Sequence, residues 1–143
     1  MTIRFAIQPE LDLLLYVFEG EYTVADYFAI YEAAYRDPRR HHGMRVIFDL
    51  HLGTPEFTPA DFGRLVGLVK ANQAAGYNPD HVALVSAGSS LVTFCDTLKA
   101  MADDVPLYLE PFHSQNQALN WLGLEDHEAE VMSFWEALRQ ECA

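Results

Sequence analysis

The segment MRVIFDL, residues 44–50, decides how the rest of the chain is interpreted. Four apolar residues, with Arg45 among them, lead to a single acid, Asp49, and a loop follows. A short run of β-branched and aromatic residues that ends before a loop is typical of a buried strand in a parallel sheet. Ligands of open α/β sheets bind at the carboxyl ends of strands, so we expect any site to lie near Asp49.

Two strands and a helix are predicted before this segment. Residues 3–7 alternate between apolar and polar or small side chains, and residues 13–18 form a nearly continuous apolar run. The short separation between these two runs predicts a hairpin. Thr23 and Asp26 resemble a capping box, which predicts a helix that stops at residues 37–38.

Helices and strands alternate after the central strand. Thr58 followed by Pro59 predicts the start of a helix, which Gly76 ends. The later predicted elements are a strand over residues 82–85, a helix that begins after residues 86–90, a strand over 105–109, a short helix after Ser114, and a last helix whose apolar stripe is Val131, Phe134, Trp135 and Leu138. Strands separated by helices of this length pair in parallel through right-handed crossovers. We therefore predict a single, mostly parallel α/β domain of order β-β-α-β-α-β-α-β-α, with an antiparallel N-terminal hairpin and an extra C-terminal helix.

The composition excludes several classes of function. The chain has 143 residues, of which 50% are hydrophobic, and its formal net charge is -12. This charge disfavours binding to nucleic acid or to an anionic membrane surface. Cys95 and Cys142 imply no disulfide framework, the first residues lack the apolar run of a signal peptide, and no run approaches the ~20 residues of a membrane-spanning helix. We expect a soluble, cytoplasmic protein with no membrane insertion and no cofactor.

Three short stretches carry a resemblance to a known family. Residues 20–27, the strand that ends at Asp49, and residues 118–123 resemble the bacterial STAS-like proteins. These proteins are related in fold to anti-sigma-factor antagonists and, loosely, to the CRAL-TRIO lipid carriers. The resemblance covers residues 1–124 and implies a four- to five-stranded sheet with helices mainly on one face. It leaves residues 125–143 as an amphipathic C-terminal helix that packs on this domain or on a partner subunit.

The same resemblance raises the hypothesis of a phosphorylation switch. In signalling members of the family, a phosphorylatable Ser or Thr follows the central strand in an Asp-Ser-Ser/Gly-Gly-like motif. Residues 49–59 lack that motif, and Thr54 and Thr58 are the hydroxyl residues that this region offers. Thr58 is explained more simply as a helix cap, because Pro59 follows it. The small-molecule-binding branch of the resemblance fits better, since it requires only an apolar cleft.

Eight residues are candidates for binding a ligand at the carboxyl edge of the predicted sheet. They are Asp49, Phe57, Phe62, Ser86, Ser89, Phe94, Tyr108 and Phe112. Each has a simpler structural interpretation. An Asp can cap the loop that follows it, a Ser can cap a helix, and aromatic residues mostly belong to an ordinary core.

A basic segment lies before the central strand. It contains Arg36, Arg39, Arg40, Arg45, His41 and His42. With His51, the two histidines could be considered for a metal site, but no His-x-x-x-His or Cys pair supports one, so a solvated loop is preferred. The arginines either complement the end of the first helix or meet the acidic surface of a partner.

The sequence supports three hypotheses of function. The first is a non-enzymatic binding protein for a small apolar ligand or a protein partner, with a possible homodimer through the C-terminal helix. The second is a regulatory switch phosphorylated on Thr54 or Thr58. The third is a small enzyme that uses Asp49 with a nearby histidine, for which no catalytic motif is present.

Overall fold

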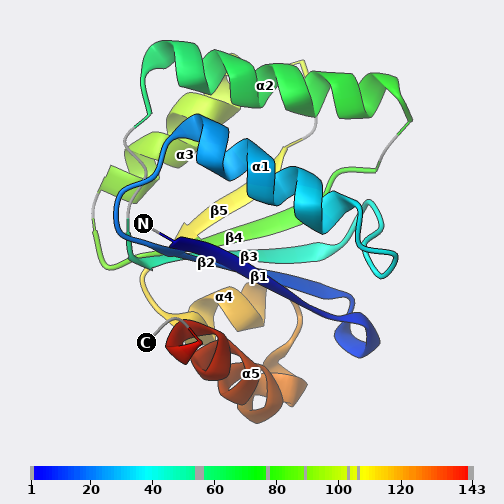
Figure 1. Ribbon diagram of the computed structural model, residues 1–143, viewed down its shortest axis with the longest axis vertical. Helices are drawn as coiled ribbons and strands as arrows, with labels where there is room; N and C mark the ends of the chain where they lie inside the picture. The colour runs from blue at the N-terminus through cyan, green and yellow to red at the C-terminus, as the bar shows by residue number, and fades with distance from the viewer. Residues whose placement is uncertain are drawn as a thin grey trace.

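One five-stranded sheet organises the computed structural model, which describes residues 2–53, 57–76, 78–88, 90–102, 104–105 and 107–141 (Figure 1). The strands lie side by side in chain order, as β1 (Thr2–Gln8), β2 (Leu13–Glu19), β3 (Arg45–Leu52), β4 (His81–Val85) and β5 (Tyr108–Phe112). β1 and β2 pair antiparallel, and each later neighbour pairs in parallel. The predicted hairpin and parallel sheet are confirmed.

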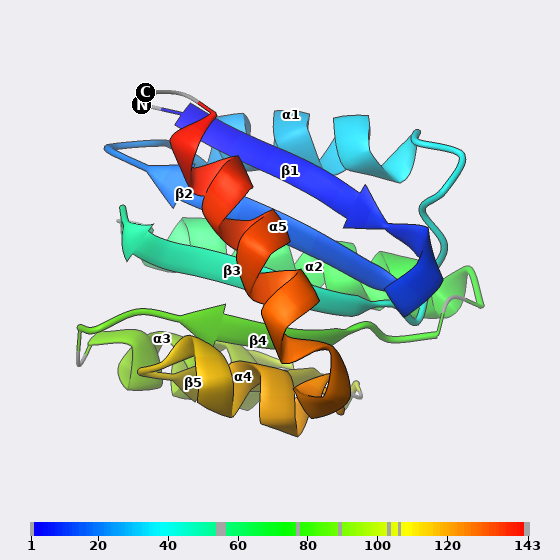
Figure 2. The same cartoon turned by 90° about the horizontal axis from the view of Figure 1, so that it is seen from below.

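Helices cover both faces of the sheet (Figures 1 and 2). The larger layer consists of α1 (Val24–Tyr35), α2 (Pro59–Ala74) and α3 (Ser90–Met101), and the other face carries α4 (Gln115–Trp121) and α5 (Glu128–Gln140). Two 3-10 turns, η1 (Pro9–Leu11) and η2 (Glu125–His127), complete the order. The predicted α/β class and the order of elements are confirmed.

β2 is buried on both faces because it lies inside this sandwich. Its residues 13–18 are all buried, as a continuous apolar run predicts for a covered strand. Leu14, Tyr16 and Phe18 belong to the core beneath α1, α2 and α3. Leu13, Leu15 and Val17 belong to a second core, against α4 and α5. The sheet therefore separates two apolar cores.

The two predicted helix caps form as the sequence indicates. The Thr23 side chain accepts a hydrogen bond from the Asp26 backbone N–H at 3.2 Å, and the Asp26 carboxylate accepts one from the Thr23 N–H at 2.9 Å. Thr58 and Asp61 repeat this arrangement at the start of α2. Each box satisfies backbone donors that a helix N-terminus leaves free.

The fifth strand lies further along the chain than the sequence predicted. A strand over residues 105–109 was expected, whereas β5 spans Tyr108–Phe112 and pairs with β4 from His81 to Val85. The strand includes Pro111, which lacks a backbone N–H and is tolerated because β5 is an edge strand. Pairing with β4, rather than local β propensity, sets the bounds of this strand.

The last helix packs on the sheet of its own chain. α5 crosses β1 and β2 on the face opposite α1 (Figure 2). Its stripe residues Val131, Trp135 and Leu138 are buried in the second core. Of the two alternatives for the C-terminal helix, the structure shows packing of α5 on the domain, which leaves this stripe covered within one chain. Among the described residues, no helix combines the length and the apolar character needed to cross a membrane.

Candidate ligand pocket

A pocket of about 430 Å³ lies between the sheet and the layer of α1, α2 and α3. The strands supply its floor, through Leu14, Tyr16 and Phe18 of β2 and Val46, Phe48 and Leu50 of β3. Pockets that bind small molecules in proteins typically enclose about 300–1,000 Å³ and are mostly apolar. The volume and the lining both fit a small-molecule site.

The pocket extends across the sheet from β2 to β5 and also along the strands. Val46, Phe48 and Leu50 are alternate residues of β3, and all three line it. A strand advances about 3.3 Å per residue, so these side chains cover about 13 Å. Tyr27 and Tyr31 line the pocket from α1 and are spaced by about one helical turn along the same direction.

Aromatic rings pack tightly around the middle of the pocket. The Phe48 ring lies 5.1 Å from Tyr16, 5.5 Å from Phe18 and 5.9 Å from Tyr27, with interplanar angles of 83°, 72° and 76°. Edge-to-face pairs of this kind are favourable beyond the area that they bury. These contacts between rings hold the aromatic side chains of the pocket wall in place.

One end of the pocket is polar, and an arginine and an aspartate there form an ion pair. Arg40 Nη2 and Asp80 Oδ2 form an ion pair at 2.6 Å, and the Arg40 side chain is only 3% exposed. The other Asp80 oxygen accepts hydrogen bonds from the backbone N–H groups of Gly43 and Met44, at 2.8 and 3.0 Å. The Arg40 guanidinium also lies over the Tyr35 ring, 5.2 Å from its centre. This cluster lies where β3 and β4 begin.

Several tyrosine side chains with buried rings form part of the remaining pocket lining. Burial raises the pKa of Tyr16, Tyr22 and Tyr27 above the ordinary value of 10.0, so all three stay protonated at neutral pH. The Tyr31 phenol accepts a hydrogen bond from the Asn72 side chain at 3.0 Å. The Tyr22 hydroxyl is buried and has no hydrogen-bond partner among the described residues. Tyr22 follows the carboxyl end of β2, opposite the Arg40 end.

Two of the predicted ligand-binding residues line this pocket, and a third packs against them. Phe57 and Phe94 line it, and their ring centres are 5.9 Å apart. Phe62 packs against both rings, at 6.3 Å from Phe57 and 5.1 Å from Phe94. These three residues form an aromatic cluster between α2 and α3 at the carboxyl edge of the sheet.

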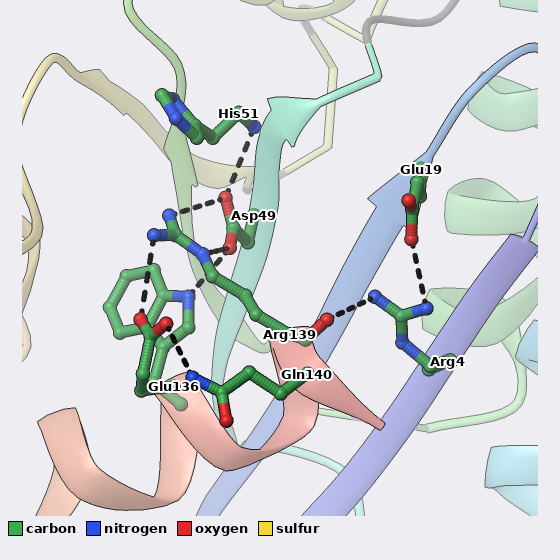
Figure 3. Close-up of polar contacts among 8 residues, drawn as sticks. Arg4, Glu19, Asp49, His51, Glu136, Arg139 and Gln140 are labelled. Atoms are coloured by element: carbon green, nitrogen blue, oxygen red, sulfur yellow. Dashed lines mark hydrogen bonds and ion pairs between the residues drawn. The ribbon is translucent and has the colours of Figure 1, made fainter. Parts of the chain in front are cut away.

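Asp49 lies on the opposite face of the sheet, so the expectation of a site around it is corrected. Its carboxylate is fully buried and accepts hydrogen bonds from Trp135 Nε1 at 2.7 Å and from Arg139 Nε at 2.6 Å (Figure 3). It also accepts one from the His51 backbone N–H at 3.1 Å. Alternation along β3 turns Asp49 toward α5, while its neighbours Phe48 and Leu50 face the pocket.

The other predicted ligand residues lie apart from the pocket. Tyr108 was expected at the carboxyl edge of the sheet, but it is the first residue of β5 and lies at the amino edge, paired with His81. The Ser86 hydroxyl accepts a hydrogen bond from the Gly88 N–H at 3.2 Å. Tyr108 is half exposed and stacks on His81, with ring centres 4.6 Å apart. Phe112 packs near Trp121 at 5.6 Å, and Ser89 lies outside the described residues. The structure brings none of the described residues Ser86, Tyr108 and Phe112 into the pocket lining.

The candidate phosphorylation and histidine sites are placed as follows. Thr54 lies outside the described residues, and Thr58 caps α2. His41 pairs with Asp12, whereas the His42 ring nitrogen Nδ1 accepts the Asn78 N–H at 2.9 Å. Within the described ranges, no group of three His, Cys, Asp or Glu side chains could hold a metal ion.

The basic segment does not form one surface. Arg36 is exposed, whereas Arg40 is buried against Asp80. Arg45 donates hydrogen bonds to the backbone carbonyls of Leu11 and Leu122. Two of the four arginines therefore serve the interior of the fold rather than a surface for a partner.

Sequence reasoning missed the phenols and the ion pair that line the pocket. Tyr16 and Phe18 share one face of β2, and Tyr27 and Tyr31 share one face of α1, so a pattern was present. By itself, such a pattern predicts an ordinary buried face rather than a pocket. No local sequence pattern predicts the ion pair of Asp80 with Arg40, because the two residues are 40 positions apart in the chain.

No protein-family model matches this chain, and the search of curated proteins finds no match either.

Proposed function

We propose that this chain is a non-enzymatic, STAS-like binding protein that holds a small, mainly apolar ligand between the sheet and α1, α2 and α3. The observation that supports this most is the 430 Å³ pocket, lined largely by aromatic and aliphatic side chains. Filling it would remove apolar ligand surface from water, which drives binding.

The charged groups at the pocket support binding more than catalysis. Asp80 is fixed by Arg40 and by two backbone N–H groups, so three of its roughly four acceptor sites are engaged. A general base needs a free acceptor within reach of the substrate proton. Asp49, on which the enzyme hypothesis rested, is held by Arg139 and Trp135 on the other face. Neither carboxylate is arranged as a free base in the pocket.

The proposal is tested with Nile red, an uncharged dye that fluoresces in apolar sites. Val66 of α2 is 6% exposed and lines the pocket, so Val66→Phe fills part of the space. Val92 of α3 is 43% exposed and gives a matched control, Val92→Phe. We expect saturable dye binding to the wild type and to Val92→Phe, and at least tenfold weaker binding to Val66→Phe. Circular dichroism confirms that each variant is folded.

Native mass spectrometry of freshly purified protein supplies an independent readout. A mass increment that disappears on denaturation would identify a ligand acquired in the cell, and chemical extraction could then name it. The proposal is contradicted if the wild type carries no increment and also binds no dye, or if Val66→Phe binds dye as well as Val92→Phe does.

A further inference from the structure

We infer that the ligand of this pocket is an amphiphile that enters at the amino edge of the sheet. Its polar head stays at that edge, where β3 and β4 begin, and its apolar body points toward Phe57 and Phe94. This inference rests on the proposed function, because it specifies the chemistry and the orientation of the ligand in the same pocket. Two observations on the pocket lining lead to it.

The first observation locates the opening of the pocket. Among the described lining residues, those that are largely exposed are His42, Gln73, Gly76 and Asn78. Gln73 and Gly76 lie at the end of α2 or just after it, and His42 and Asn78 lie in the segments before β3 and β4. A residue that lines a pocket and is also exposed lies where the pocket meets solvent. Both α1 and α2 end at this edge of the sheet (Figure 1), so the pocket opens there.

The opposite end of the pocket is apolar and covered. Its described lining at the carboxyl edge includes Phe18, Leu50, Phe57 and Phe94, all of which are buried or half-buried. The oxygen of Tyr22 at this end is itself buried, so it presents no polar atom to a ligand. Ligands of open α/β sheets usually bind at the carboxyl ends of the strands. This pocket departs from that rule, because its opening lies at the other edge.

The second observation is that the polar side chains of the lining gather at the opening. Every charged, imidazole or amide side chain in the described lining lies at the amino edge, and these residues are Arg40, His42, Asn72, Gln73, Asn78 and Asp80. Asn72 donates a hydrogen bond to the Tyr31 hydroxyl at 3.0 Å. His42 Nδ1 accepts one from the Asn78 backbone N–H at 2.9 Å. Amide side chains both donate and accept hydrogen bonds, so the opening suits a head group such as a hydroxyl or an amide.

The difference between the two ends sets the orientation of a bound amphiphile. A polar head at the opening keeps hydrogen bonds to water and to the amide side chains. Beside Phe57 and Phe94 it would lose its water without gaining a partner, which is unfavourable. The apolar body gains free energy by leaving water for this aromatic interior. A purely apolar ligand would cover polar side chains at the opening without pairing them, so an amphiphile fits the lining better.

The orientation is tested with 1-decanol, which has one apolar chain and one hydroxyl. Isotope-filtered NMR detects contacts between the unlabelled alcohol and isotopically labelled protein. We expect the protons of the CH₂OH group to contact Asn72 and Gln73, and the methyl protons to contact the rings of Phe57 and Phe94. Contacts of the methyl group with Asn72 and Gln73, or of both ends of the alcohol with both sets of residues, would overturn the inference.

The position of the opening is tested by the rate at which Nile red enters the pocket. Gln73→Trp places a large side chain at the opening. Ala71→Trp is the matched control, because Ala71 is exposed on the same helix and lies outside the described pocket lining. In stopped-flow fluorescence, we expect association and dissociation of the dye to be at least tenfold slower in Gln73→Trp than in the wild type, and unchanged in Ala71→Trp. Circular dichroism confirms that both variants are folded.

The outcomes separate this inference from the proposed function. If the wild type binds neither Nile red nor 1-decanol, the proposed function itself fails. If both bind, but 1-decanol lies in the reverse orientation or Gln73→Trp exchanges the dye as fast as Ala71→Trp does, the inference is overturned while the pocket stands.

Discussion

Asp49 and Arg139 are 90 positions apart in the chain, and their side chains form a two-point ion pair beneath the sheet. Arg139 Nε lies 2.6 Å from Asp49 Oδ2, and Arg139 Nη2 lies 3.2 Å from Asp49 Oδ1 (Figure 3). Trp135 donates to the same carboxylate from one turn earlier in α5. A carboxylate within the central strand β3 therefore holds the last helix in place.

The first prediction concerns this ion pair. Asp49→Asn keeps the size of the side chain but leaves the mostly buried Arg139 without its counter-ion, so it should lower the free energy of unfolding by about 2–4 kcal/mol. Urea denaturation measures the change. Glu136→Gln is the control, since Glu136 is exposed and lies 3.9 Å from Arg139, and it should cost less than about 1 kcal/mol. Equal losses in the two variants would show that Asp49 does not anchor α5.

The second prediction concerns the close approach of two glycines after β2 and β3. A Cβ on Gly53 would lie 2.5 Å from the carbonyl oxygen of Gly20 and 2.7 Å from its nitrogen. Gly53→Ala should therefore destabilise the fold by about 1–3 kcal/mol through overpacking. Gly67→Ala is the matched control, because a Cβ there meets no atom within 4 Å, and inside a helix it should stabilise by about 0.5–1 kcal/mol. Thermal unfolding that ranks the two variants in the opposite order would contradict this close approach.

The third prediction separates the cap at Thr58 from a phosphorylation switch. Thr58→Ala removes the acceptor for the Asp61 N–H and should cost about 1 kcal/mol, whereas Thr58→Ser keeps an acceptor and should cost much less. Thr23→Ala should behave in the same way, because Thr23 caps α1 through an equivalent box. Chemical denaturation compares the three. If Thr58→Ala is as stable as the wild type, the cap does not explain Thr58, and incubation with cell extract and labelled ATP becomes the decisive assay.

The fourth prediction concerns the reactivity of Cys95. Burial raises the pKa of this thiol to about 12, so its thiolate is scarce at mildly alkaline pH. In a Cys142→Ser variant, Cys95 should resist a thiol-specific reagent such as Ellman's reagent in the native state and should react fully in urea. Fast labelling of the native variant would show that the face of α3 that carries Cys95 is not buried in the core.

The fifth prediction is a loss of stability at alkaline pH. The folded pKa values of Cys95 and Tyr16 lie above the ordinary values of 9.0 and 10.0, so the unfolded chain releases protons that the folded chain keeps. Their contribution is present below pH ~9 and declines as pH rises above it. The urea midpoint should fall over this range, and Tyr16→Phe should flatten the fall. A midpoint that stays constant above pH ~10 would contradict the burial of these groups.

Local patterns predicted most of the secondary structure. The caps at Thr23 and Thr58 depend on partners three residues away, so the sequence displays them directly. The apolar run of residues 13–18 predicts that both faces of the strand are buried. This prediction needs no knowledge of which residues cover the strand. β5 was misplaced because its bounds depend on the register with β4, which no local pattern encodes.

The pocket was only partly predictable. Phe57 and Phe94 were selected because they follow strands at one edge of the sheet, and both line the pocket. Tyr22 and Arg40 were not selected, since an aromatic residue before a helix and an arginine in a basic segment have ordinary interpretations. The pocket becomes evident only when the parallel pairing of β2, β3 and β4 brings these segments beneath one helical layer.

The amino-acid sequence by itself determined the order of elements, the helix caps and the sheet type, because these depend on near neighbours and on average burial. Only the tertiary structure decided that Asp49 meets Arg139 and that Arg40 meets Asp80 at the pocket. Asp49 points to the face of the sheet opposite the pocket, although its chain neighbours Phe48 and Leu50 line the pocket. Which side chains meet depends on how segments far apart in the chain pack together. The sequence allows many such pairs, and the long-range contacts of the fold select one of them.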